Sequence, residues 1–77
     1  MKRFLVTWED VYVDHGWHEI ASFTLAPKVF ETLAFLVSED DDHYVFAPTI
    51  NPLDETIGDP WVVPKCLVSD MKPIVFV

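Results

Sequence analysis

The sequence predicts a single small domain that is mainly β. Its 77 residues are too few for two domains, and 51% of them are apolar, which suffices for one modest core. Short runs rich in β-branched and aromatic residues alternate with prolines and acidic stretches, which is typical of strands and turns. No apolar run approaches the ~20 residues of a membrane-spanning helix. The length also excludes a (β/α)₈ barrel or a cleft between two domains.

The first predicted strand covers residues 2–8, where Phe4, Val6 and Trp8 share one face with a period of two. We expect Trp8 in the core, because a domain this small needs its large aromatic side chains buried. Residues 9–19 indicate a long loop, since acids, histidines and a glycine leave only a short apolar patch. The stretch that follows suits either a short helix or irregular chain, and its pattern leaves both open.

The middle of the chain predicts a β-hairpin. Residues 29–37 and 43–47 are rich in β-branched and aromatic residues, and the acidic segment 38–42 separates them. A helix over residues 28–37 is an alternative, because several of its side chains suit one. We favour a strand, because no capping glycine follows and the acids would lie at the negative end of a helix dipole.

The last third predicts a proline-bracketed loop at residues 48–60. It is followed by a strand at 61–63, a turn at 65–70 and a strand at 71–77. Pro73 cannot donate a ladder hydrogen bond, so the last strand lies at an edge or begins there. Over residues 1–77, five short strands with a long first loop fit an SH3-like or Sm-like barrel, because closure removes exposed edges. The apolar last strand would otherwise be an open edge, which predicts a homo-oligomer.

Thirteen acidic side chains against five basic ones give a formal net charge of −8. This balance excludes direct binding of nucleic acid, because neutralising phosphates needs clustered Lys and Arg. Eleven of the acids lie in three predicted connections, at residues 9–19, 39–42 and 54–59. These connections are therefore the leading candidate for a working surface. The single cysteine, Cys66, can form no internal disulfide, which fits a reducing compartment.

Two clusters have the composition of a metal or acid–base site. His15 and His18, with flanking carboxylates, suit Zn²⁺ binding or proton transfer, but no second spaced pair of ligands accompanies them. We expect a polar loop around a packed Trp17 and leave metal binding open. The acids at 39–42 lack the alternating spacing and central glycine of an EF-hand. A solvated turn is the expectation there, with a docking or anion-mimicking surface as the alternative.

No nucleophile, phosphate-cradle or C-x-x-C motif occurs, so we predict that the protein is not an enzyme and needs no cofactor. Cys66 has no sequence-defined base, and we expect a buried or half-buried structural thiol. Lys65 is expected to pair with an acid of the chain, with a ligand phosphate as the alternative. The candidate binding residues, for a partner or a ligand, are Trp17, His18, Glu39, Asp40, Asp41, Asp42, Tyr44, Trp61 and Lys65.

Five segments, in order, resemble a family of short, mostly uncharacterised proteins of tailed bacteriophages and prophages. The segments are W-x-D at Trp8 and Asp10, G-W at Gly16 and Trp17, an aliphatic strand with an acidic turn at residues 36–42, an A-P strand at 46–49, and a P-K element at 63–65. The similarity covers roughly residues 4–70. The chain departs from the pattern at Ala34 and Cys66, where members often have glycine.

The resemblance implies a phage accessory protein in the cytoplasm of the bacterial host, and it implies no particular activity. Together with the charge, it predicts a non-enzymatic protein that binds and inhibits or modulates a host protein with a basic surface. Host defence proteins and nucleic-acid-handling proteins are the expected targets, the latter through mimicry of DNA. One alternative is an oligomer that sequesters a nucleotide-type immune signal between aromatic rings, with Lys65 at the phosphate. A virion structural or assembly component is the other. We expect no membrane partner.

Overall fold

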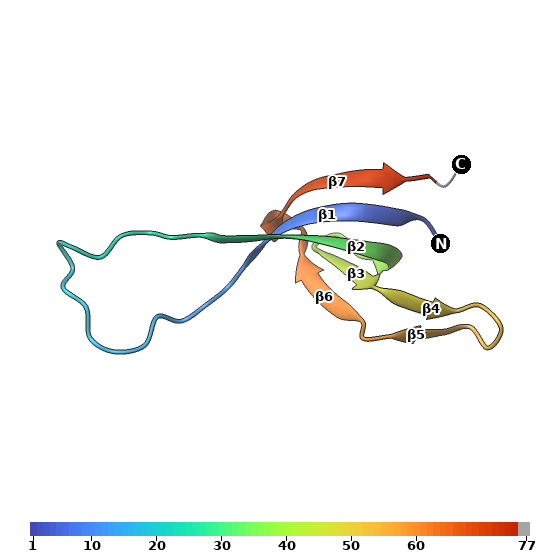
Figure 1. Cartoon of the computed structure of the whole chain (residues 1–77), viewed down its shortest axis with the longest axis horizontal. Helices are drawn as coiled ribbons and strands as arrows, with labels where there is room; N and C mark the ends of the chain where they lie inside the picture. The colour runs from blue at the N-terminus through green and yellow to red at the C-terminus, as the bar shows by residue number, and fades with distance from the viewer. Residues whose placement is uncertain (76–77) are drawn as a thin grey trace.

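A computed structural model of the chain describes residues 1–75 and confirms a mainly β protein (Figure 1). The elements are β1 (Arg3–Asp10), β2 (Lys28–Glu39), β3 (His43–Ala47), β4 (Thr49–Asn51), β5 (Thr56–Gly58), β6 (Trp61–Pro64), the 3₁₀ helix η1 (Lys65–Leu67) and β7 (Val68–Ile74). Among residues 1–75, no helix has the length and apolar character needed to cross a membrane.

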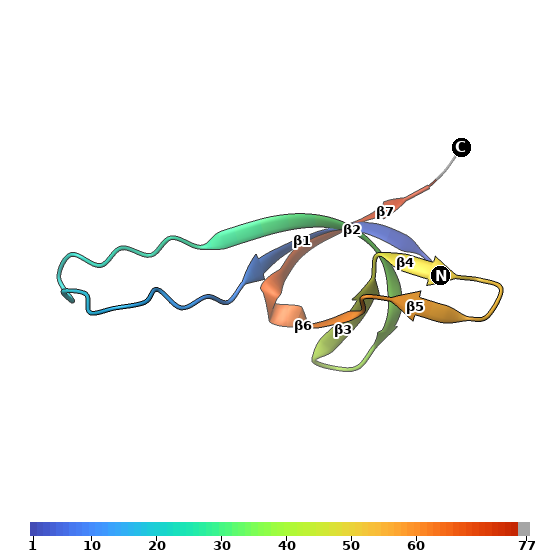
Figure 2. The same ribbon diagram turned by 60° about the horizontal axis from the view of Figure 1, so that its bottom comes forward.

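Five strands form one antiparallel sheet in the order β6-β3-β2-β1-β7. The long strand β2 bends along its length, so that its first part pairs with β1 and its last part with β3 (Figure 2). A register shift between Leu36 and Ser38 lies within the second pairing. β6 and β7 are the two edges, and within the described residues no ladder joins them. The ladder therefore stays open where a closed barrel was predicted.

The core lies on the concave side of this sheet. Val6, Ala34, Phe46 and Val63, one from each of four strands, are buried in a single cluster. They alternate along their strands with outward-facing residues, as the period of two predicts. The predicted strand at residues 28–37 is confirmed, and the helical alternative is wrong, because the pairing with β1 runs through this whole segment.

Trp8 packs against the core, as predicted. Its indole makes one hydrogen bond and contacts two other aromatic rings. Its Nε1 donates a hydrogen bond to Thr32 Oγ1 at 3.0 Å, so the polar atom is satisfied while the ring is half-buried. The ring centroid lies 5.4 Å from that of Phe30 and 6.2 Å from that of Trp61. This aromatic row links β1, β2 and β6 across the concave face.

Two parts of the prediction for the last third are wrong. The proline-bracketed loop contains a two-stranded sheet, β4 and β5, in which Ile50 pairs with Ile57. Asp54 stabilises the intervening turn by accepting hydrogen bonds from the backbone N–H and the hydroxyl of Thr56. The last strand also begins at Val68 and not at residue 71, directly after η1. Residues 76 and 77 of that predicted strand lie outside the described residues.

β7 is an edge strand, as Pro73 predicted, because it pairs only with β1. Phe4 faces Pro73 in that pairing. Two of the predicted loop acids, Glu9 and Asp10, belong to the end of β1, and Glu39 ends β2. The acids still lie near strand ends, but fewer of them lie in loops than expected.

Residues 11–27, here named the arm, connect β1 to β2 and project from the sheet (Figure 1). The arm contains one turn, in which the N–H groups of Ser22 and Phe23 donate to the carbonyl of Glu19. It therefore forms no helix over residues 20–25. The Tyr12 hydroxyl donates a hydrogen bond to the Ala26 carbonyl and joins the two legs of the arm near its base. The molecule measures 54 × 25 × 23 Å as a result.

Candidate binding surfaces

The predicted site residues fall into three separate places. Residues 39–42 gather with Tyr44 and Lys65 at the β2–β3 turn, here named the acidic turn. Trp17 and His18 lie on the arm, which projects from the sheet (Figure 1). Trp61 packs its ring against Phe46 at a centroid distance of 5.1 Å. Of the aromatic rings that a nucleotide-sequestering site would use, the structure therefore brings Tyr44 to Lys65 and leaves Trp17 apart on the arm.

Asp40 organises the acidic turn. Its Oδ1 accepts hydrogen bonds from the backbone N–H of Asp42 at 2.8 Å and of His43 at 2.6 Å. The His43 ring nitrogen Nδ1 lies 3.1 Å from the same oxygen. The backbone N–H of Asp42, followed by that of His43, lowers the pKa of the Asp40 carboxyl below its ordinary value of 3.8. Asp40 is thus a structural acid, whereas Asp41 and Asp42 point their charges at solvent.

Replacing this carboxylate, as in Asp40→Ala, is expected to lower the melting temperature at pH 7. Because the folded-state pKa is depressed, the stabilisation is complete above the ordinary value of 3.8 and disappears as the pH falls through the lowered value. Thermal melts of both proteins should therefore differ at pH 7 and converge toward pH 2. An equal difference at both pH values would show that the carboxylate charge contributes nothing to the turn.

Lys65 forms an internal ion pair, as predicted. Its Nζ lies 3.3 Å from Glu39 Oε1 and 4.9 Å from the centroid of the Tyr44 ring. Its backbone N–H donates to the Asp42 carbonyl at 2.8 Å, which ties η1 to the turn. The Lys65 ammonium, which a ligand phosphate would contact, therefore already contacts the Tyr44 ring, on which a ligand base would stack.

Three expectations about single residues differ from the structure or lack support in it. Trp17 is fully exposed and not packed, because no other part of the described chain covers its ring. Cys66 is exposed and not a buried structural thiol. His18 Nε2 lies 3.2 Å from the His15 carbonyl oxygen and 3.7 Å from Asp14 Oδ1. Across residues 1–75, no group of three His, Cys, Asp or Glu side chains has the geometry of a metal site.

Trp61 packs against the core. Its ring lies between those of Trp8 and Phe46, on the concave face of the sheet. Its Nε1 is buried and has no hydrogen-bond partner. An unpaired N–H of this kind costs stability, which the packing of the large ring offsets.

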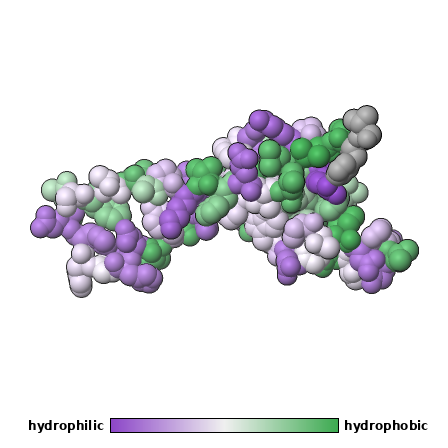
Figure 3. Space-filling view, viewed as in Figure 1, coloured by the Kyte–Doolittle hydropathy of each residue, from purple (hydrophilic) through white to green (hydrophobic). Residues whose placement is uncertain are grey.

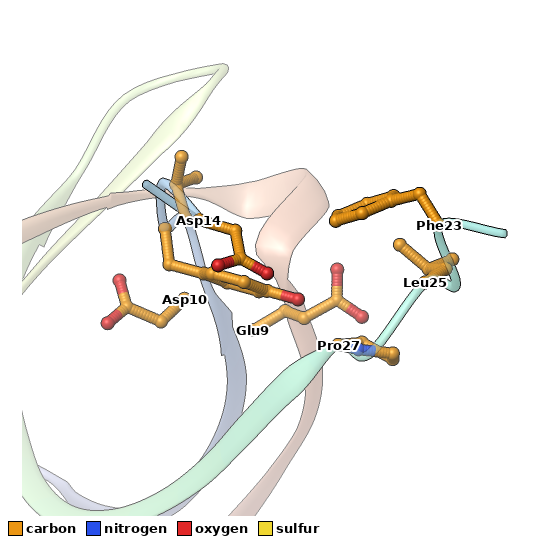
Figure 4. A pocket seen from close by; sticks show the side chains of 8 residues that line it. Glu9, Asp10, Asp14, Phe23, Leu25 and Pro27 are labelled. Carbon is orange, nitrogen blue, oxygen red and sulfur yellow. The ribbon is translucent and has the colours of Figure 1, made fainter. Parts of the chain in front are cut away.

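A cavity of about 370 Å³ lies where the arm leaves the sheet, and we name it the root pocket (Figure 4). It is lined by Glu9, Asp10, Val11, Tyr12, Asp14, Phe23, Leu25 and Pro27. Figure 4 shows the Glu9 carboxylate directed toward Phe23, Leu25 and Pro27, with the carboxylate of Asp14 nearby. The Asp10 carboxylate points to the opposite side. The residues come from the end of β1 and both legs of the arm.

The lining of the root pocket combines negative charge with apolar walls. Its three charged lining residues are all carboxylates, and one ammonium lies close by: Lys28 Nζ is 4.7 Å from the centroid of the Tyr12 ring. One ammonium against three carboxylates leaves the neighbourhood negative. Such a pocket suits a Lys or Arg side chain, whose stem packs on apolar surface while its charged end meets a carboxylate.

Sequence patterns did not identify the root pocket. The sequence predicts Glu9, Asp10 and Asp14 only as acids of a loop and gives no role to Tyr12 or Phe23. The one local signal is the apolar run at residues 11–13 with acids on both sides. Which residues of the second leg face this run depends on how the arm folds back, and no local pattern specifies that.

No protein-family model matches this sequence, and no curated protein or solved structure is significantly similar to it.

Proposed function

We propose that the chain is a non-enzymatic, acidic binding protein that takes a basic side chain of a protein partner into its root pocket. The observation that carries this proposal is the lining of the pocket, where the carboxylates of Glu9 and Asp14 lie beside the apolar walls from Phe23 to Pro27. The pocket is open to solvent, which suits capture of a side chain from a surface better than enclosure of a small substrate.

The net charge of −8 supports a partner with a basic surface. A field of one sign accelerates the encounter of oppositely charged proteins and weakens as salt screens it. Asp41 and Asp42, whose carboxylates are free of the contacts that occupy Asp40, add to this field. The acidic turn then steers association, and the root pocket makes the specific contact.

A phage origin and a host target complete the proposal. The order and spacing of the W-x-D, G-W, acidic-turn and P-K segments support a phage accessory protein that acts on a host protein in the bacterial cytoplasm. The strand order β7-β1-β2-β3-β6, with a long first connection and a 3₁₀ turn before β7, supports an SH3-like architecture. Proteins that bind DNA or act in defence have the basic surfaces that this proposal requires.

The test is affinity capture from a bacterial lysate at moderate salt, followed by titration of the captured protein. The variant Glu9→Gln with Asp14→Asn keeps the size of both side chains and removes two charges from the pocket. We expect binding about tenfold weaker or more, because each lost charge leaves a partner cation unpaired.

The matched control is Asp41→Asn with Asp59→Asn. It also removes two negative charges, but from exposed positions outside the pocket. It should slow association slightly and leave the dissociation rate unchanged. Equal weakening in both variants would show that net charge alone drives binding and would contradict the assignment to the root pocket. Capture of no specific partner, or co-purification with virions alone, would contradict the proposed function.

A further inference from the structure

The described chain exposes far more surface than a compact protein of its mass. Its accessible surface is 6240 Å², about 1,400 Å² more than the roughly 4,800 Å² expected for a folded monomer of 8.9 kDa. Its radius of gyration is 16.0 Å, whereas a compact domain of this length has about 11.5 Å. Most of the difference comes from the arm, because the sheet itself is compact (Figure 1).

The arm exposes apolar side chains along its whole length. Figure 3 shows hydrophobic residues distributed along it between hydrophilic ones. The exposed large apolar residues of the arm are Val11, Val13, Trp17, Ile20, Phe23 and Leu25. Residues 11–27 include two acids and no Lys or Arg, so the arm has little charge to keep this surface in solvent. An apolar surface of this extent indicates an interface.

A second exposed apolar surface lies on the outer face of the sheet. Leu33 is 54% exposed and Val29 is 57% exposed, although both belong to the central strand β2. Leu5 of β1 pairs with Leu33, and Lys72 of β7 pairs with Leu5. Glu31 lies between Leu33 and Val29 on this face, so we name the paired residues Leu5 and Leu33 the outer patch. These residues alternate with the buried Val6 and Ala34 and therefore point away from the core.

We propose that two copies of this chain form a symmetric dimer in which the outer part of each arm, from Val13 to Ile20, lies on the outer patch of the other copy. The root pocket at the base of the arm stays open in this dimer, because Phe23 and Leu25 remain in its lining. Area is the first argument. Burial of about 800 Å² from each chain, a little over half of the excess, gives an interface of the standard size for a stable complex.

The size of the core is the second argument for a second copy over an unrelated partner. Within residues 1–75, five apolar residues are fully buried. A chain whose partner is an unrelated protein spends time unbound, and its own core must then keep it folded. A single core of this size gives little stability. A copy of the same chain is present whenever the chain is made. In addition, Glu19 of the arm and Lys72 beside the outer patch have opposite charges.

Sedimentation equilibrium over a range of concentrations measures the assembly. We expect a dimer for the natural sequence. Ile20→Ser should raise the dimer dissociation constant by about a hundredfold, because both copies in a symmetric interface lose the buried apolar side chain. Leu53→Ser is the matched control: Leu53 is 96% exposed, close to the 98% of Ile20, but lies in the β4–β5 turn. It should leave the constant unchanged.

Cross-linking of the unchanged protein tests the arrangement without relying on a variant that folds. Chains grown on ¹⁴N and ¹⁵N are mixed, and a zero-length carbodiimide joins neighbouring carboxylates and amines. We expect peptides of mixed isotope that link Glu19 to Lys72. A monomer at high concentration overturns the proposal. So does a dimer that survives Ile20→Ser unchanged, or mixed-isotope links confined to the edge strands. None of these results bears on binding of a basic partner, which the capture experiment measures separately.

Discussion

Phe46→Ala is expected to unfold the domain at room temperature. Phe46 is fully buried, and its ring packs on Trp61 and Tyr44 at centroid distances of 5.1 and 5.5 Å. Removing a buried Phe side chain costs about 3–5 kcal/mol. A single core in a chain of this length rarely supplies more than about 3–5 kcal/mol in total. The substitution therefore removes most of the free energy of unfolding.

Chemical denaturation followed by tryptophan fluorescence measures this effect, because Trp8 and Trp61 both lie against the core. All samples are compared at one protein concentration, since association contributes to the stability of a self-assembling chain. Leu53→Ala is the control, and its effect should stay within about 0.5 kcal/mol because Leu53 is exposed. A loss below 1 kcal/mol for Phe46→Ala would show that the core is not where the structure places it.

Ala34→Leu is expected to cost about 1–3 kcal/mol, because the added methylene groups have no space in the core. Ala34 is buried at the centre of β2, faces Phe4 in the ladder and contacts the cluster of Val6, Phe46 and Val63. The larger side chain must push neighbouring strands apart.

Enlarging an exposed strand residue outside the arm, Val62→Leu, provides the control for Ala34→Leu, because Val62 of β6 is 62% exposed. Both proteins are compared by chemical denaturation at one concentration. We expect the control to unfold at the same denaturant concentration as the natural sequence and Ala34→Leu to unfold earlier. Equal midpoints for all three proteins would mean that the sheet has room at Ala34, and the described packing would be wrong.

The strands that contain a strong local pattern could be predicted from the sequence. Phe4, Val6 and Trp8 alternate with the period of a strand, and β1 carries all three on its inner face. The acids after Val37 argued against a helix, and β2 ends at Glu39 before a turn. Pro73 limited the last strand to an edge for want of an N–H. In each case the decisive information lies within a few residues.

The β4–β5 sheet and the arm could not be predicted in the same way. Prolines and acids at residues 48–60 indicate a loop, and the hairpin there depends on turn hydrogen bonds that the side chains of Asn51 and Asp54 accept from backbone N–H groups. The exposure of Trp17 has no local cause. A tryptophan beside a glycine is equally compatible with burial, and only the projection of the arm away from the sheet decides the outcome.

The sequence by itself determined the β class, the main strands and the edge position of the last strand. Those features follow from residue periodicity and from the missing N–H of a proline, which act over short distances along the chain. Only the tertiary structure decided that the sheet stays open, that Glu9 and Asp14 meet Phe23 in one pocket, and that the arm exposes its apolar residues. These features depend on which distant segments come together, and that is set by packing of the whole chain.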